Sequence, residues 1–382
     1  MTIYLIIFAI SVILFFFSEK VKVSFFERIL VLLGLIAPSL LAGMRSLYVG
    51  TDVLTYVYPL FHIAESSSSY LQYLNMPALN GGILQTVSSY EYGYTFLTYV
   101  VAKLTGSFQF LQFFIEFFIL SFIYLGIRRL KIDNMPIWFC MLTYYLLFFN
   151  NSLNMVRQWM AMSILLYGFK YIKEQKLTKF IITILFAYLF HSTAIIGLLL
   201  YLLYWIIKVS SKRSLVFNSY SDNSLSVTAV SFILLVFFSC AVILLINRLY
   251  PLLGTLGLSK YSYYLSGDFS FSINQFILKV PILLIISLNI NEIFKKDSKI
   301  YFYLILVLDV IASQLASLSD YSIRMSIYLA MFNIYGYAIL SESNNRVKMF
   351  VIRFLIIIYL LIYWYYTYCV KGNDQTVPYV FF

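Results

Sequence analysis

The hydrophobic residues of this chain of 382 residues occur in long blocks that short polar segments separate. The blocks Thr2–Phe17, Leu225–Ile246 and Lys348–Tyr368 hold almost no charge. Each is close to the roughly 20 residues that a helix needs to cross a bilayer. A water-soluble protein built from such blocks would expose far too much apolar surface. The pattern therefore predicts an all-α polytopic integral membrane protein.

Lysine and arginine residues gather between alternate blocks and are scarce in the other connections. The clusters lie at Lys20–Arg28, Arg128–Lys131, Lys170–Lys179, Lys208–Arg213, Lys295–Lys299 and Arg346–Arg353. Because positive residues mark cytoplasmic loops, we expect both termini and the long loops 43–92 and 247–274 on the outer side. About twelve spans follow, at 2–17, 27–42, 107–127, 136–149, 155–171, 178–190, 192–207, 226–246, 275–290, 300–318, 322–340 and 349–368.

The same rule decides two ambiguous stretches. Residues 178–207 are apolar throughout but have basic flanks on both sides, which predicts a hairpin with an outward apex at His191-Ser192-Thr193. Residues 92–105 form a short apolar segment with Lys103 inside it. A span there would return Arg128 and Arg129 to the outside, so we expect a re-entrant or interfacial helix. The chain is predicted to be a single transmembrane helical domain with no internal repeat.

Composition narrows the chemistry. The net charge of +11 is accounted for by the cytoplasmic clusters, so it does not indicate a nucleic-acid partner. Three cysteines without a spaced pair suggest neither a disulfide framework nor zinc. The sequence has no GxxxxGK[ST] phosphate loop, no HExxH, no Asp-x-Asp and no GxSxG. We therefore expect no metal and no cofactor.

Ionisable residues gather at one predicted level, the outer interface. Charged groups inside a membrane cost about 2.5–3.5 kcal/mol each on insertion scales, so their placement is informative. The set comprises Arg45, Asp52, Glu91, Arg157, His191, Asp320 and Arg324. They come from separate connections, and we expect them to converge in three dimensions.

Arginine offers a planar fork of donors that holds phosphate oxygens and keeps its charge. Together Arg45, Arg157 and Arg324 would suit a doubly anionic diphosphate at the headgroup level. Tyr56 is one of several outer tyrosines, whose rings can stack on sugars or form the interfacial aromatic belt. A histidine with a near-neutral pKa at the apex, His191, would make a good base.

Each of these residues also has a plainer structural interpretation. Arg157 could pair with a lipid headgroup, although a helix N-terminus disfavours a cation. Arg324 lies four residues after Asp320 and could pair with it. The remaining structural roles are a turn cap for His191, an N-cap of 53–64 for Asp52, a first-turn carboxylate for Glu91, and interhelical hydrogen bonds for Glu116 and Asp309.

Several short motifs resemble, in order, those of the EpsG family, the Wzy-like polymerases of bacterial exopolysaccharides and capsules. The motifs are "RSLYVGTDVLTYVYPL" (Arg45–Leu60), "EYGY" (Glu91–Tyr94), "NMVRQWMA" (Asn154–Ala161), "FHSTAII" (Phe190–Ile196), "YSIRMSIYL" (Tyr321–Leu329) and the tail "VPYVFF" (Val377–Phe382). Residues 210–274 show no such match, so the outer loop 247–274 is where substrate specificity could reside.

The resemblance implies a glycosyltransferase of the bacterial cytoplasmic membrane with an outward-facing site. It would polymerise oligosaccharide units carried on undecaprenyl pyrophosphate, with membrane lipids around it and chain-length and export proteins as partners. Arg45, Arg157, Arg324, Gln158 and Tyr56 would bind substrate, and His191, Glu91 or Asp52 would take the acceptor proton. The alternatives are a flippase of the same lipid-linked units, a ligase or acyltransferase, and a non-catalytic export subunit.

Overall fold

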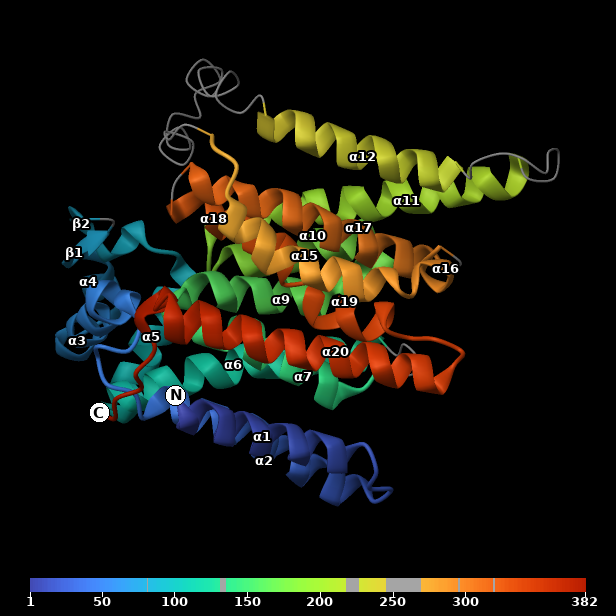
Figure 1. Cartoon of the computed structure of the whole chain (residues 1–382). Helices are drawn as coiled ribbons and strands as arrows, with labels where there is room; N and C mark the ends of the chain where they lie inside the picture. The colour runs from blue at the N-terminus through green and yellow to red at the C-terminus, as the bar shows by residue number, and fades with distance from the viewer. Residues whose placement is uncertain (81, 131–134, 218–226, 245–268, 295, 319) are drawn as a thin grey trace, which may run out of the picture. The chain divides into compact units, whose positions relative to one another are not determined.

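The computed structural model of the chain describes residues 1–80, 82–130, 135–217, 227–244, 269–294, 296–318 and 320–382 (Figure 1). About 80% of the described residues are helical. In this described part, strand is confined to one antiparallel hairpin of β1 (Pro77–Asn80) and β2 (Ile83–Thr86). The predicted fold class, an all-α membrane protein, is confirmed.

The chain divides into two compact units. The first comprises Met1–Tyr171, Lys176–Gly197 and Leu360–Phe382, and the second comprises Ile172–Gln175 and Leu198–Tyr359. The expectation of a single helical domain stays a prediction.

The first unit combines long apolar helices with a small folded region at one end. Its elements are α1 (Thr2–Ser18), α2 (Ser24–Gly43), η1 (Val53–Val57), α3 (Tyr58–Ser66), α4 (Tyr70–Asn75), β1, β2, η2 (Val87–Ser89), α5 (Tyr92–Thr105), α6 (Phe108–Leu130), α7 (Ile137–Tyr144), η3 (Tyr145–Phe149), α8 (Asn150–Asn154), α9 (Val156–Lys173), α10 (Leu177–Tyr188), η4 (Ser192–Ile196), η7 (Tyr365–Val370) and η8 (Asn373–Gln375). Within this unit, both chain termini lie at the same end as α3, α4 and the hairpin (Figure 1).

Close helix contacts hold the first unit together. A Cβ atom on Gly43, at the end of α2, would lie 2.9 Å from the Cβ of Phe113 on α6, so only glycine permits this approach. Between α1 and α2, the Ser11 hydroxyl donates to the carbonyl of Gly34 at 2.6 Å and lies 2.7 Å from the Tyr145 hydroxyl. These buried hydrogen bonds satisfy polar groups that would otherwise be costly in an apolar core.

The second unit consists of helices. They are α11 (Gly197–Phe217), α12 (Val227–Leu244), α15 (Ile273–Ser287), α16 (Ile290–Ile293), α17 (Asp297–Ala312), η6 (Ser313–Ser317), α18 (Asp320–Ala330), α19 (Asn333–Leu340) and α20 (Arg346–Trp364), which enters the first unit at Leu360. Inside it, the Lys279 ammonium donates to both carboxylate oxygens of Asp309 at 2.6 and 2.7 Å, and the Asn333 amide donates to the same carboxylate at 3.1 Å.

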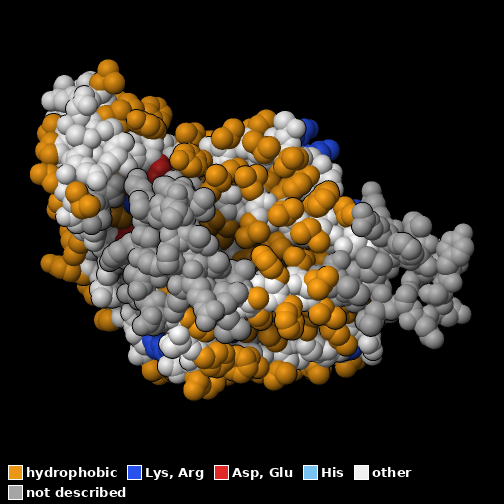
Figure 2. All heavy atoms as spheres, turned by 90° about the horizontal axis from the view of Figure 1, so that it is seen from above, with side chains coloured by type: hydrophobic (Ala, Val, Ile, Leu, Met, Phe, Trp, Pro, Cys, Tyr) orange, Lys and Arg blue, Asp and Glu red, His pale blue; other side chains and the backbone are white. Residues whose placement is uncertain are grey.

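The surface is that of a membrane protein. On the face drawn in Figure 2, hydrophobic side chains dominate what the described residues expose. Large apolar residues are exposed along α1, α2 and α20. Among the described residues, 5 helices are long and apolar enough to span a bilayer, or 6 if a pair bent by 41° near Ala330 counts as one span. Several apolar helices are shorter, so the number twelve stays a prediction.

The predicted element positions agree well with the helices. Every predicted span falls on a helix or a pair of helices. The segment 92–105 is a separate helix, α5, which Gly106 ends with a left-handed residue (φ 58°). The stretch 178–207 breaks after α10, where the 3-10 turn η4 begins at Ser192. The loop 43–92 is folded, whereas most of the loop 247–274 lies outside the described residues.

Candidate functional site

An ion pair between Arg157 and Glu91 lies at the centre of the candidate site. Met155 leaves the helical conformation (ψ 59°) and separates α8 from α9, so Arg157 falls in the first turn of α9. Its Nη1 donates to Oε2 of Glu91 at 2.6 Å, and the two side chains are 17% and 16% exposed. Glu91 precedes α5 but makes no side-chain cap on it, so its carboxylate serves Arg157 instead.

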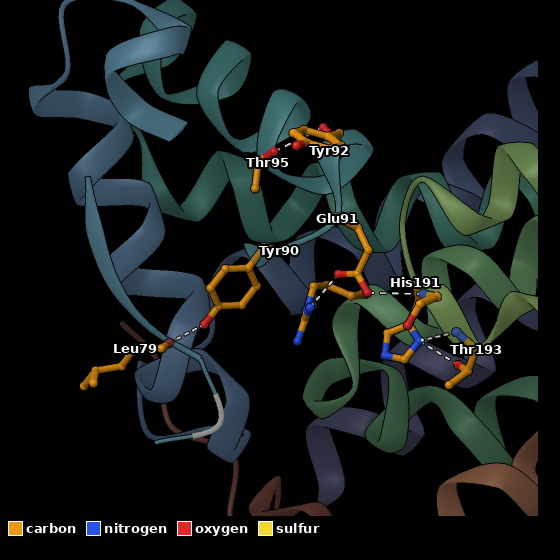
Figure 3. Close-up of polar contacts among 9 residues, drawn as sticks. Leu79, Tyr90, Glu91, Tyr92, Thr95, His191 and Thr193 are labelled. Carbon is orange, nitrogen blue, oxygen red and sulfur yellow. Dashed lines mark hydrogen bonds and ion pairs between the residues drawn. The ribbon is translucent and has the colours of Figure 1, made fainter. Parts of the chain in front are cut away.

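Two tyrosine rings enclose the guanidinium. The Arg157 Cζ lies 4.6 Å from the ring centre of Tyr56 and 4.8 Å from that of Tyr90. Such cation–π contacts stabilise the charge and restrict its orientation. Tyr90 is in turn held by a short hydrogen bond from its hydroxyl to the carbonyl of Leu79 on β1 (Figure 3). We call Arg157, Glu91, Tyr56 and Tyr90 the Arg157 cluster.

His191 lies on the other side of Glu91. Figure 3 shows Glu91 directed at the turn that carries His191 and Thr193, and the backbone N–H of Ser192 donates to Oε1 of Glu91 at 3.2 Å. The structure therefore brings Arg157, Glu91 and the His191 turn together, as the sequence predicted for these residues. Glu91 connects the starts of two helical elements, α9 and η4, that the chain separates widely.

The His191 ring caps its own turn. Its Nδ1 accepts the backbone N–H of Thr193 at 3.3 Å and lies 2.6 Å from the Thr193 hydroxyl. A backbone N–H can only donate, so Nδ1 is the acceptor and the proton of the neutral ring is on Nε2. The plainer interpretation of His191 as a turn cap is thus correct. A base role for Nε2 would require the ring proton to move from Nε2 to Nδ1.

The pKa of Glu91 is below its ordinary value. Burial alone would raise this pKa, but the nearby Arg157 charge, His191 and hydrogen bonds to the carboxylate together outweigh burial. Glu91 is therefore ionised near neutral pH and is a weaker base than an ordinary glutamate. Burial also raises the pKa of Tyr90 and of Tyr56, so both phenols stay neutral.

Arg45, which the sequence places in the long loop after the second predicted span, is buried. It is 3% exposed, and its Nε donates to Oε1 of Gln112 in the first turn of α6 at 2.7 Å. The chain returns over it, since Arg45 pairs with Phe381 in an isolated bridge. Within the described residues its Nη1 has no hydrogen-bond partner. Tyr56 is near enough to influence both Arg45 and Arg157 electrostatically.

Asp52 precedes η1 and makes no side-chain cap there, so its predicted capping role is wrong. Its backbone N–H instead donates to the Asn154 side chain at 3.0 Å, and its charge acts on Tyr56 and Tyr90. The Asp52 carboxylate is thus electrostatically coupled to the Arg157 cluster.

Gln158, the other predicted substrate-binding residue on α9, follows Arg157 and is 5% exposed.

Arg324 lies in the second unit, on α18, and is half-buried. Arg45 and Arg157 belong to the first unit, so a clamp of all three arginines stays a prediction. The mid-span carboxylates are satisfied as expected: Glu116 accepts hydrogen bonds from Tyr144 at 2.8 Å and Ser152 at 3.0 Å, and Asp309 is paired with Lys279. Among the described residues, no group of three His, Cys, Asp or Glu side chains could hold a metal ion.

The sequence analysis missed an asparagine network directly before Arg157. Asn150, Asn151 and Asn154 each bond to the C-terminal tail, at Thr376 and Asp374. The signal was present as "NNSLN", three amides in an otherwise apolar stretch. Their partners lie more than 200 residues away, so no local pattern could identify them.

These features define a helical membrane protein with a buried, preorganised cation near one end of its first unit. The chain belongs to the EpsG family, whose family model matches residues 28–381. This makes it a polysaccharide polymerase-like membrane protein. Comparison with curated proteins and with solved structures gives no match.

Proposed function

We propose that the protein polymerises lipid-linked oligosaccharide units on the outer side of the bacterial cytoplasmic membrane. The observation that carries this proposal is the Arg157 cluster. It presents a permanently charged, aromatic-enclosed guanidinium, and within the described residues the Nε of Arg157 is buried without a hydrogen-bond partner. An orphaned buried donor is costly unless a ligand or water satisfies it. A diphosphate oxygen would supply that acceptor.

In the proposed reaction, an acceptor hydroxyl oxygen attacks the anomeric carbon of the donor glycan. The bond from that carbon to the diphosphate oxygen breaks, and undecaprenyl pyrophosphate leaves with the electron pair. Arg157 stabilises the charge that develops on the leaving group, and Arg45 and Arg324 are the further candidates for this task. The acceptor proton passes to a base of the protein.

The three candidate bases are not equivalent. Glu91 has a lowered pKa and is bound to Arg157, which makes it a positioning carboxylate rather than a base. His191 would act through Nε2 in its other tautomer, with the ring proton on Nδ1 and the bond from the Thr193 N–H given up. Asp52 would act through its carboxylate, which lies near Tyr56 and Tyr90. A missing general base costs about a hundred- to ten-thousandfold in rate. Comparing His191→Ala with Asp52→Asn therefore identifies the base, and near-full activity in both variants would refute this part of the mechanism.

The flippase alternative receives no specific support. It would require charges along a central path through the membrane. The described mid-span charges Lys279 and Asp309 neutralise each other, and Glu116 is hydrogen-bonded within its helical surroundings.

The test uses a strain in which the gene is deleted. Arg157→Ala should leave lipid-linked single units unpolymerised on the outer leaflet, whereas units trapped on the inner leaflet would indicate a flippase. Arg128→Ala is the matched control, because Arg128 lies 16 residues beyond Gln112 on α6, about 24 Å along the helix. Wild-type chain lengths in Arg157→Ala would contradict the role of Arg157, and polymer of normal length in the deletion strain without any added gene would contradict the proposed function.

Orientation is tested separately by labelling single cysteines in a cysteine-free background. Tyr48 is 78% exposed in the loop that carries Arg45 and Asp52, and Lys20 follows the C-terminal end of α1. A membrane-impermeant thiol reagent should label Tyr48→Cys in intact cells and should spare Lys20→Cys. The reverse pattern would place the site on the cytoplasmic side.

A further inference from the structure

The C-terminal tail is bonded to the segment that leads into Arg157. The two carboxylate oxygens of Asp374 each accept one amide N–H, Oδ2 from Asn151 and Oδ1 from Asn154, both at 2.9 Å. The three side chains are called the asparagine clasp. They connect η8 with α8, which ends two residues before α9 begins.

The hydrogen-bond roles in the clasp follow from its outer partners. The Asn154 Oδ1 accepts the backbone N–H of Asp52 at 3.0 Å and the Thr51 hydroxyl at 2.8 Å. The Asn151 Oδ1 accepts the indole N–H of Trp159 at 2.8 Å. A backbone N–H and an indole N–H can only donate, so neither amide can be turned round without losing a bond. Both NH₂ groups must therefore face position 374, which has to offer two acceptors and no donor.

An ionised aspartate meets this requirement, and asparagine does not. Asp374 has a left-handed backbone (φ 63°), a conformation that Asp and Asn tolerate better than most residues. Asp374→Asn should therefore preserve backbone and shape, but it replaces one acceptor by an NH₂ group that would face another NH₂ group. The effect of this substitution is thus confined to one hydrogen bond.

The tail also follows the loop that carries Arg45 and Asp52. The backbone N–H of Gly50 donates to the carbonyl of Gln375 at 3.1 Å, and the N–H of Ser46 donates to that of Val380 at 2.8 Å. A Cβ on Gly50 would lie 2.9 Å from the carbonyl oxygen of Leu153, so this loop packs directly on α8. Loop, α8 and tail are therefore one connected piece of structure.

We propose that Asp374 is a positioning residue for the candidate site, an inference that rests on the proposed function. Through Asn154 it holds the backbone of Asp52, and through Asn151 and Trp159 it holds the first turn of α9, which carries Arg157. Asp374 itself contacts neither substrate nor reacting atoms. Its role is to set the distance between the carboxylate of Asp52 and the guanidinium of Arg157.

The test exchanges the two members of one hydrogen bond. Asp374→Asn alone, or Asn154→Asp alone, leaves a mismatched pair at this contact. In the double variant Asp374→Asn/Asn154→Asp, the new amide donates to the new carboxylate and still accepts from Asn151. The carboxylate at position 154 still accepts the N–H of Asp52. Asn373→Ala is the matched control, because Asn373 is the exposed neighbour of Asp374.

Two readouts are used on the full-length protein in nanodiscs. The first is Trp159 emission with Trp138, Trp205 and Trp364 replaced by Phe, since Trp159 bonds directly to the clasp. The second is the rate of polymer formation from lipid-linked units. The Asp374→Asn variant should shift the emission to longer wavelength and lower kcat about ten- to a hundredfold, the range expected when a reacting group is misplaced. The double variant should restore both, and Asn373→Ala should change neither.

The outcomes separate the two proposals. If Arg157→Ala abolishes polymer while Asp374→Asn keeps wild-type kcat, positioning by Asp374 is refuted and the proposed function stands. If the exchange restores the emission but the wild-type protein forms no polymer from lipid-linked units, the clasp exists and the proposed function fails. If the double variant recovers neither readout, the bonding scheme is wrong.

Discussion

Each compact unit contains a largely buried ion pair, and the two pairs are built differently. In the second unit, Lys279 comes from the middle of α15 and Asp309 from the last turn of α17, and Asn333 adds a third bond to the carboxylate. In the first unit, Arg157 and Glu91 stand at the beginnings of α9 and α5, enclosed by Tyr56 and Tyr90. The Lys279–Asp309 pair is satisfied by its own partners. The Arg157–Glu91 pair has a donor, the Arg157 Nε, that has no hydrogen-bond partner in the described structure.

The contrast shows why a charge within an apolar protein is not by itself evidence of a site. A pair between helix interiors satisfies both charges and fixes helix packing. A pair at helix starts draws on loop residues, keeps partial exposure and can accept a ligand. The comparison therefore assigns a structural role to Lys279–Asp309 and a binding role to Arg157.

The largest expected effect is on stability in the second unit. Lys279→Ala leaves the Asp309 carboxylate, which is 1% exposed, without its charge partner. Breaking such a pair costs about 3–5 kcal/mol in the free energy of unfolding. Thermal unfolding in detergent measures the loss. The double variant Lys279→Met/Asp309→Leu should recover most of it, and equal destabilisation of single and double variants would show that the pair is not a closed unit.

The next effect concerns pH and Glu91. Its lowered pKa means that the ionised carboxylate stabilises the fold above its ordinary pKa of 4.5. This contribution is lost as the pH falls through the lowered pKa of the folded state. The stability difference between wild type and Glu91→Gln should therefore be constant near neutral pH and shrink in acid. Unfolding measured over this range tests it, and a difference that does not vary with pH would contradict the ion pair.

The smallest effect separates the ring of Tyr90 from its hydroxyl. Tyr90→Phe loses the bond to Leu79 but keeps the ring over Arg157, so diphosphate affinity should stay near wild type. Tyr90→Leu removes a cation–π contact of about 1 kcal/mol and should weaken affinity about fivefold. Equal affinities for the two variants would mean that the ring does not orient the guanidinium.

Much of the fold was predictable because local patterns determine it. Apolar blocks gave the helix positions, and α5 agrees with the predicted segment 92–105. The proximity of Glu91, Arg157 and His191 was also predicted, since the positive residues place all three at one level. The pairing of Arg157 with Glu91 was not, because it depends on the break at Met155.

The sequence did not reveal the contacts between residues that are far apart along the chain. Arg45 follows a helix end and looks exposed, but the tail covers it through Phe381 and its Nε reaches Gln112. Asp374 lies in a polar tail with no motif of its own, and its partners Asn151 and Asn154 are 223 and 220 residues away. Such contacts depend on how the whole unit closes, not on periodicity or spacing.

The central claim is that Arg157 binds a lipid diphosphate. Equilibrium binding of undecaprenyl pyrophosphate to the purified protein in nanodiscs tests this directly, with Arg157→Ala compared against Arg128→Ala. The account predicts that Arg157→Ala weakens binding at least about tenfold, as expected for a lost charge-assisted contact, while Arg128→Ala binds like wild type. Equal affinity of Arg157→Ala and wild type would contradict it.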